Sequence, residues 1–305
     1  MRLDPGRGLT ERLIALPDGR HLRTVVAGKG AGPLVVFEAG MSGPASTWIH
    51  TQREVSRSAR TLSYDRAGYG GSDVDPEDRT LERIVDDLIA LLDSAGETSP
   101  VILVGHSWGG PIIRLFAHRC PERVAGLVFI DASVVEGMPE RNARLLVRVF
   151  SALAVLARAG SAGRALITKL SLPHGHSPEI SEVDMTIMTR DYACAQAMRT
   201  AAREAAQIIA ALPTLRGLQA AGTPHVPTIC VQGGRVDRGM ATLRPKLNET
   251  AAHLMAAVPD GRVVIVEAAG HLIPQEQPAA VGTAILEVVA AAAANSLSSR
   301  NATEL

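Results

Sequence analysis

Apolar residues along this chain fall into short runs that alternate with segments of helical spacing. Each run is four or five residues long and rich in Val, Ile and Leu, which is typical of a strand buried on both faces. The runs occupy residues 34–37, 101–104, 126–130, 228–231 and 263–266. Between them, apolar positions recur every three or four residues, most clearly at 80–94. This alternation predicts an α/β fold, a mostly parallel sheet with helices on both faces.

The alternation is interrupted in the middle of the chain. Residues 134–222 show helical patches but no clear strand pattern. The patches cover residues 141–158, 182–195 and 197–212. We interpret this stretch as a helical cap inserted into an α/β core made of residues 1–133 and 223–295. The polar end of the chain, 296–305, is predicted to be a disordered tail.

One strand-to-helix junction carries the motif G-x-S-x-G. Residues 105–109 read G-H-S-W-G directly after the apolar run 101–104, and apolar residues at helical spacing follow from Ile112. Pro111 suits the first turn of a helix, where its missing N–H removes no helical bond. A sharp turn at this point lifts the Ser107 hydroxyl clear of the sheet, near the positive end of the helix dipole. Ser107 is therefore the candidate nucleophile.

A serine nucleophile needs a base, and the base needs a carboxylate that orients it. His271 follows a glycine in the loop after the last apolar run, from which it can reach across the sheet edge to Ser107. Asp237 follows the preceding run and completes the order Ser, Asp, His along the chain. Asp131, at the end of an earlier run, is the alternative acid. We favour Asp237 because its loop is nearer to His271 in chain order.

The negative charge that develops during acyl transfer needs preorganised N–H donors. Trp108 supplies one, because it directly follows the candidate nucleophile. The second is expected from the Gly-rich loop at 38–44, most directly from the backbone of Met41. Trp108 and Met41 are thus the predicted oxyanion hole.

The amino-acid composition limits the kinds of binding partner and the cellular compartment that we expect. The chain has 31 basic and 31 acidic residues, so its net charge of zero does not support a nucleic-acid or anionic-membrane partner. Cys120, Cys194 and Cys230 are far apart and read as free thiols of a reduced compartment. No secretory signal pattern is visible at the N-terminus. We expect a cytoplasmic protein with a small-molecule substrate and no membrane insertion; the oligomeric state is not indicated.

A histidine pair in the cap has the types of residue that bind metals. His174 and His176 alternate in a Pro- and Gly-containing loop, not far from Asp184 in the sequence. Alternating histidines in such a loop are more often exposed than ligating, and the other motifs need no metal. The sequence therefore predicts neither a metal nor an organic cofactor.

Three segments together resemble the α/β-hydrolase superfamily. They read D-R-A-G-Y-G-G-S at 65–72, G-H-S-W-G-G at 105–110 and G-H-L-I-P at 270–274. The resemblance covers residues from about 20 to 133 and 226 to 292, and leaves the cap unmatched. It implies an eight-stranded sheet, a lid and the triad Ser107–Asp237–His271. Ala39 stands where many members have a histidine, so Met41 as a donor is inferred from its position.

The resemblance also indicates a type of reaction. Haloalkane dehalogenases and epoxide hydrolases of this fold use an aspartate nucleophile, whereas Ser107 points to acyl transfer. Several methionines in the cap suggest an apolar substrate wall, although they could equally be ordinary packing. These are Met138, Met185, Met188 and Met198. The favoured function is a serine hydrolase that cleaves a small, largely apolar carboxylic ester through an acyl-enzyme.

Other functions remain open at this point. An aminopeptidase or amidase would need cap carboxylates for a substrate amine, and Glu179, Glu182 and Asp184 keep that possibility. A carbon–carbon bond hydrolase and a cofactor-free perhydrolase share the same fold. A ligand-binding module without turnover is a different class of function, and the intact Ser, Asp and His argue against it.

Overall fold

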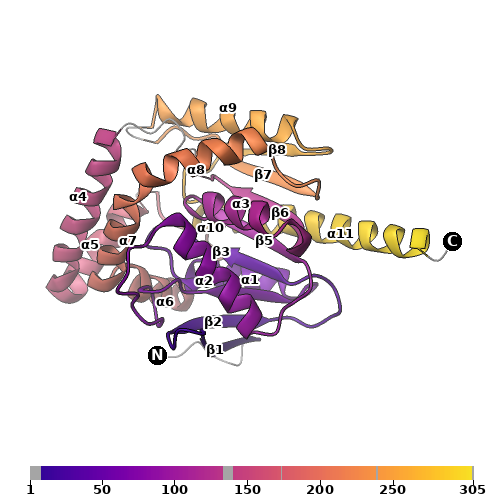
Figure 1. Ribbon diagram of the computed structural model, residues 1–305. Coiled ribbons are helices and arrows are strands. Elements are labelled where there is room, and N and C mark those ends of the chain that lie inside the picture. Colours follow the sequence, from indigo (N-terminus) through magenta and orange to yellow (C-terminus); the bar gives the residue numbers. More distant parts are fainter. Residues whose placement is uncertain (1–7, 133–139, 173, 238–239, 304–305) are drawn as a thin grey trace.

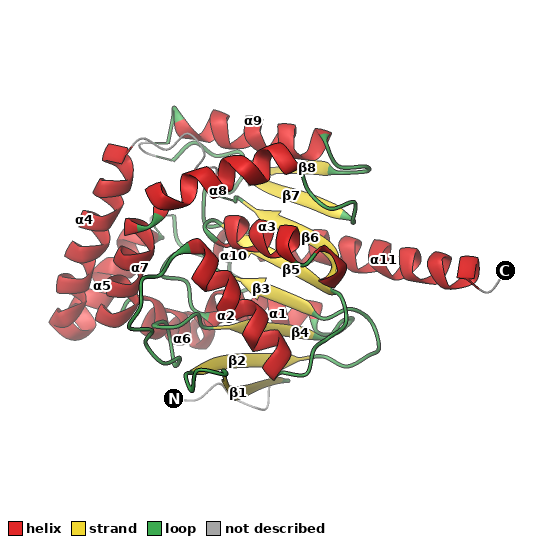
Figure 2. Ribbon diagram, in the orientation of Figure 1, coloured by secondary structure: helices red, strands yellow, loops and turns green. Residues whose placement is uncertain are grey.

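The computed structural model describes residues 8–132, 140–172, 174–237 and 240–303, with side chains to residue 296. Its centre is a sheet of eight strands in the order β1-β2-β4-β3-β5-β6-β7-β8 (Figure 2). The strands are β1 (Leu9–Ala15), β2 (His21–Ala27), β3 (Val35–Glu38), β4 (Thr61–Tyr64), β5 (Val101–His106), β6 (Val124–Ile130), β7 (Thr228–Gly233) and β8 (Arg262–Val266). The pairs β1–β2 and β2–β4 are antiparallel, and all other pairs are parallel. The predicted fold class is confirmed.

Successive side chains of the central strands point to opposite faces of the sheet, and each face has its own helices. Val36 and Leu103 pack toward one layer, and Phe37 and Val104 toward the other. The first layer holds α2 (Leu81–Ser94), α3 (Gly109–Arg119), α8 (Ile208–Ala221) and α9 (Leu243–Ala256). The second layer holds α1 (Ile49–Val55) and α11 (Pro278–Thr303). Burial on both faces explains why the strands read as continuous apolar runs.

The described residues between β6 and β7 form helices joined by loops, with no strand among them, as the sequence predicted. The helices are α4 (Glu140–Leu156), the short 3-10 helix η4 (Ala157–Ala159), α5 (Gly160–Ser171), α6 (Glu182–Tyr192), α7 (Ala195–Ala206) and α8. Of these, α5 was not among the predicted helical patches. Figure 1 shows α4 and α5 at one end of the molecule, opposite the end at which α11 leaves the sheet. Short helices lie in three core loops: η2 (Ala45–Trp48), η3 (Pro121–Arg123) and α10 (Ile273–Glu276).

The predicted disordered tail is wrong for the part of it that the structure describes. Helix α11 continues to Thr303, past the point at which the helix was expected to end. The five alanines at 290–294 have the highest helix propensity, and no Gly or Pro follows before Thr303 to stop the helix. Polar composition alone therefore did not mark a helix end.

Two described helical segments are long and apolar enough, by length and composition alone, to cross a membrane. One spans Glu140–Ser171, and 11% of its most apolar window is buried; the other spans Pro278–Ser296, with 33% buried. The second segment places Val281, Ile285 and Val288 against the sheet, which accounts for its apolar face. The first segment lies mostly outside the core.

Candidate active site

The G-x-S-x-G motif forms the turn between β5 and α3. Ser107 has a φ of +52°, in the left-handed region that residues with a Cβ rarely adopt. A Cβ at Gly105 would lie 2.7 Å from the carbonyl oxygen of Gly109, and a Cβ at Gly109 would collide with the carbonyl of Glu38. Glycine is therefore required on both sides of the strained serine, as the motif predicted.

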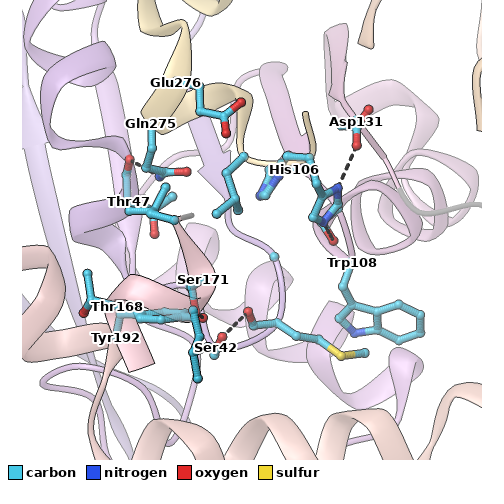
Figure 3. A pocket seen from close by; sticks show the side chains of 18 of the residues that line it. Ser42, Thr47, His106, Trp108, Asp131, Thr168, Ser171, Tyr192, Gln275 and Glu276 are labelled. Carbon is cyan, nitrogen blue, oxygen red and sulfur yellow. Dashed lines mark hydrogen bonds and ion pairs between the residues drawn. The ribbon is translucent and has the colours of Figure 1, made fainter. Parts of the chain in front are cut away.

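His271 joins the serine to a carboxylate. Its Nε2 lies 3.0 Å from Ser107 Oγ, and its Nδ1 lies 2.7 Å from Asp131 Oδ2. His271 is in the loop between β8 and α10, and Asp131 directly follows the last residue of β6. Figure 3 marks the bond that Asp131 makes with the imidazole. Ser107 and His271 thus lie together as predicted, and the carboxylate beside them is the alternative acid.

The expectation that Asp237 orients His271 is wrong in this structure. Asp237 Oδ1 lies 2.7 Å from Nε of Arg235 and 3.2 Å from Nε2 of His174 in the cap. Asp237 lies four residues beyond Gly233, the last residue of β7. Its carboxylate therefore lies at the rim of the cavity. Asp131 needs no such loop, because the end of β6 places it directly beside the elbow strand β5.

Asp131 is fully buried and held from three sides. Besides His271, Arg244 of α9 donates to both carboxylate oxygens, and the Gly233 N–H donates to Oδ1 at 3.0 Å. Burial by itself raises the pKa of Asp131. The hydrogen bond and charge of His271, followed by those of Arg244, outweigh burial and lower this pKa to about 2. Asp131 is therefore ionised throughout the physiological pH range.

Arg244 and His106 contact the site but were not among the predicted residues. Arg244 lies on the buried face of α9, in line with Leu247 and Ala251, and a charged residue in such a line is the signal that could have found it. The Nε2–H of His106 donates to the His271 carbonyl oxygen at 2.9 Å. Burial, with a smaller contribution from the charge of His271, lowers the pKa of His106 to about 4. It is neutral at pH 7, and because a carbonyl oxygen can only accept, its single N–H is on Nε2.

The loop after β3 passes directly over the serine. A Cβ at Gly40 would lie 3.1 Å from Ser107 Cβ. The Gly40 carbonyl accepts a bond from Arg66 Nη2 at 2.9 Å, and all described peptides are trans. In a trans peptide the C=O and the next N–H point in opposite directions, so the Met41 N–H points away from Arg66. Within the described part of the chain, neither the Met41 nor the Trp108 N–H has a hydrogen-bond acceptor.

Arg66, from the D-R-A-G-Y-G-G-S segment, is itself fixed by two buried carboxylates. Its Nη1 lies 2.6 Å from Glu38, and its Nε and Nη2 lie 3.0 and 2.9 Å from the two oxygens of Glu204 in α7. Nη1 also donates to the Ala39 carbonyl at 2.6 Å. Arg66 therefore ties the loop above the serine to both the sheet and the cap.

A cavity of about 510 Å³ opens above Ser107, between the cap and the carboxyl edge of the sheet. Most of its lining is apolar, including Met41, Trp108, Leu146, Phe150, Met185 and Met188. Figure 3 shows Thr47 and Gln275 on one side of it and Trp108 on the other. Met185 and Met188 were predicted wall residues. Met198 instead packs inside the cap with Ile167 and Ala193, and Met138 lies outside the described residues.

The cap carboxylates do not line this cavity. Asp184 makes a bidentate pair with Arg53 at 3.1 Å, and the side chain of Glu179 is half exposed and lies 3.9 Å from His50. Neither of them, nor Glu182, is among the lining residues. Among the described residues no cluster of three or more His, Cys, Asp or Glu side chains could hold a metal ion.

Comparison with known proteins agrees with the fold. The model of the alpha/beta hydrolase family matches residues 35–284. Epoxide hydrolase 4 of Mus musculus is 34% identical over 131 residues, which is 42% of this chain and 36% of that protein. The first curated relatives are matched over only 17–46% of their own length.

Solved structures match over nearly the whole chain at lower identity. A thermophilic esterase from Thermogutta terrifontis has a TM-score of 0.70 at 24% identity, covering 93% of this chain and 99% of that one. Epoxide hydrolase VrEH1 from Vigna radiata has a TM-score of 0.72 at 21% identity, covering 92% and 98%. Since the family model spans most of its length, this chain belongs to the alpha/beta hydrolase family.

Proposed function

We propose that this protein is a serine hydrolase that cleaves small, largely apolar carboxylic esters through an acyl-enzyme on Ser107. The observation that carries the proposal is the bonded line from Ser107 through His271 to Asp131 at the floor of an apolar cavity. In this line Asp131 takes the role that chain order had suggested for Asp237.

The geometry supplies each proton transfer. The ionised Asp131 accepts the Nδ1–H of His271, which leaves the lone pair of Nε2 facing the serine hydroxyl. As Ser107 Oγ attacks the ester carbonyl, its proton moves to Nε2, and Asp131 stabilises the imidazolium. The Trp108 and Met41 N–H groups stabilise the oxyanion.

The second half of the reaction reverses these roles. His271 Nε2–H protonates the leaving alkoxide, which departs as the alcohol and leaves the acyl group on Ser107. Water then enters, loses a proton to Nε2 and attacks the acyl carbonyl. The acid is released, and the proton on Nε2 returns to Ser107 Oγ.

The nucleophile favours esters over the epoxides named in several relatives. An epoxide opened by the Ser107 hydroxyl would leave an ether on the enzyme, and water does not hydrolyse an ether readily. An acyl group on the same oxygen is an ester, which a second water can cleave. Ser107 therefore supports acyl transfer, although epoxide hydrolases share the fold.

A fluorophosphonate probe tests the nucleophile directly. The wild type should become labelled, and Ser107→Ala should not. Ser171→Ala is the matched control, because Ser171 also lines the cavity but makes its hydrogen bond with Tyr192, at 2.6 Å, so this variant should label normally. An unlabelled wild type, or equal labelling of Ser107→Ala, would contradict the proposal.

A substrate panel then separates the reaction types that share this triad. p-Nitrophenyl esters of increasing acyl length should be turned over with a higher kcat/KM than aminoacyl anilides, because no cap carboxylate lines the described cavity to hold a substrate amine. Faster anilide cleavage would favour an amidase. Labelling without turnover of any ester or anilide would point to carbon–carbon cleavage or perhydrolysis.

A further inference from the structure

The outer surface of the cap is unusually apolar for an exposed surface. Of the eleven large aliphatic side chains that are exposed in the described part of the chain, five lie on α4 and α5. They are Leu145, Val149, Val155, Leu166 and Leu170, with exposed fractions from 42% to 69%. Clusters of exposed apolar residues mark interaction surfaces more often than isolated ones do.

The same stretch is positively charged, although the net charge of the whole chain is zero. Residues 141–178 contain no Asp or Glu but six basic residues, which leaves 25 basic against 31 acidic residues in the rest of the chain. The six are Arg141, Arg144, Arg148, Arg158, Arg164 and Lys169. All of them are exposed except Arg164, which is half-buried. This stretch of the cap is thus basic on an otherwise acidic molecule; at its start, Glu140 of α4 pairs with Arg144.

The basic and aliphatic side chains share one face of α4. At 100° per residue, Arg141, Arg148 and Val155 fall on the same side of the helix, and all three are exposed. The opposite side carries Leu146 and Phe150, which line the cavity. Helix α5 follows through η4 and presents Leu166, Lys169 and Leu170 to solvent.

We propose that this cap face, the exposed side chains of α4, η4 and α5, docks on a lipid bilayer that contains anionic headgroups. Aliphatic side chains with arginines among them are the composition of a helix that lies in the membrane interface. The arginines match the negative headgroups, and each basic residue near such a surface adds to the attraction. Exposed basic residues recur from Arg141 to Lys169, which suits helices that lie on the bilayer and not a segment that crosses it.

Docking would bring the cavity to the lipid. Leu170 is 61% exposed and also lines the cavity, so the cap face is continuous with the cavity mouth. An apolar ester dissolved in the bilayer would then reach Ser107 with little exposure to water. Only this consequence rests on the proposed function; the docking does not.

Sedimentation with vesicles tests the docking without any turnover. The protein should bind vesicles of phosphatidylcholine with 30 mol% phosphatidylglycerol in 0.1 M NaCl, bind pure phosphatidylcholine at least tenfold more weakly, and be released at 0.5 M NaCl. Arg148→Glu/Arg158→Glu should lower the partition coefficient by at least about tenfold. Arg216→Glu/Lys246→Glu makes the same change of charge at exposed positions of α8 and α9, and should bind like the wild type.

Three results would overturn the proposal. The first is a wild type that does not sediment with anionic vesicles. The second is equal binding by Arg148→Glu/Arg158→Glu and the control pair. The third is a wild-type dimer that this double variant dissolves, without vesicle binding, which would assign the face to a second copy. Ser107→Ala should bind vesicles normally, so failure of the proposed hydrolase activity would not affect this test.

Discussion

Two aspartates follow neighbouring strands of the sheet, and only one of them contacts His271. Asp131 comes directly after β6 and is fully buried, whereas Asp237 comes four residues after β7 with 22% of its side chain exposed. Asp131 is bonded by the Gly233 backbone and by Arg244, both of which belong to the core. Asp237 is bonded by its own loop and by His174 of the cap.

The difference teaches which carboxylate can orient a base. A catalytic acid must keep its position to within about 0.5 Å, and a strand end whose carboxylate is bonded by three donors provides that rigidity. The Asp237 carboxylate is instead bonded within its own loop and to a half-exposed histidine of the cap. Nearness along the chain to His271 is therefore a weaker guide than nearness within the sheet, where β6 lies beside β5.

Replacing the buried acid should have the largest effect on turnover. Asp131→Asn removes the charge that stabilises the His271 imidazolium and favours the wrong tautomer, so kcat should fall by about 10³–10⁴-fold. The measurement is kcat for a p-nitrophenyl ester at saturation, with circular dichroism to verify that the variant is folded. A folded Asp131→Asn with near-normal kcat would remove Asp131 from the triad.

Removing the arginine behind that acid should have a smaller effect. Arg244→Met leaves Asp131 with its bonds to His271 and Gly233 but without its bidentate partner, which should cost about 3 kcal/mol of unfolding free energy. kcat should fall by about tenfold with little change in KM, because Arg244 does not line the cavity. Arg244→Lys keeps the charge and should recover part of both losses. Equal kcat values for Arg244→Met and wild type would limit Arg244 to a role in stability.

The sequence predicted the parts of the site that the backbone itself demands. Ser107 was predictable because its strained turn requires Gly105 and Gly109, and His271 because its glycine-flanked loop follows the last strand. The acid was not, since chain order does not state which strands are neighbours in the sheet. Arg244 was missed because a single arginine in an amphipathic helix is ordinarily read as a solvent-facing residue.

The cap shows a second limit of sequence reasoning. Most of its helices, though not α5, were predicted from their spacing, but which faces meet the cavity depends on how the helices pack. Met185 and Met188 line the cavity, and Met198, equally apolar, packs within the cap. The alanine run that extends α11 to Thr303 was visible, yet polar residues beyond it suggested disorder.

The dependence of the unfolding free energy on pH tests the ionisation of Asp131 independently of turnover. The folded pKa of Asp131 is about 2, below its ordinary value of 3.8, so its stabilisation is complete above pH 3.8 and is lost as the pH falls through 2. The shift corresponds to about 2 kcal/mol. The difference in urea unfolding free energy between wild type and Asp131→Asn should therefore shrink between pH 5 and pH 2.5. A difference that stays constant over this range would contradict the lowered pKa.

Replacing Asp237 should have the smallest effect, which makes it the sharpest control for the comparison. Asp237→Asn removes the charge that faces Arg235 and His174. Ion pairs that are as exposed as these contribute less than about 1 kcal/mol to the free energy of unfolding. kcat should stay within about threefold of wild type, since Asp237 makes no bond to His271 in the structure. Any change should fall on KM, because Asp237 lines the cavity rim. A loss of kcat as large as that expected for Asp131→Asn would mean that the loop after β7 replaces the strand end during turnover, and that the static geometry assigns the acid to the wrong strand.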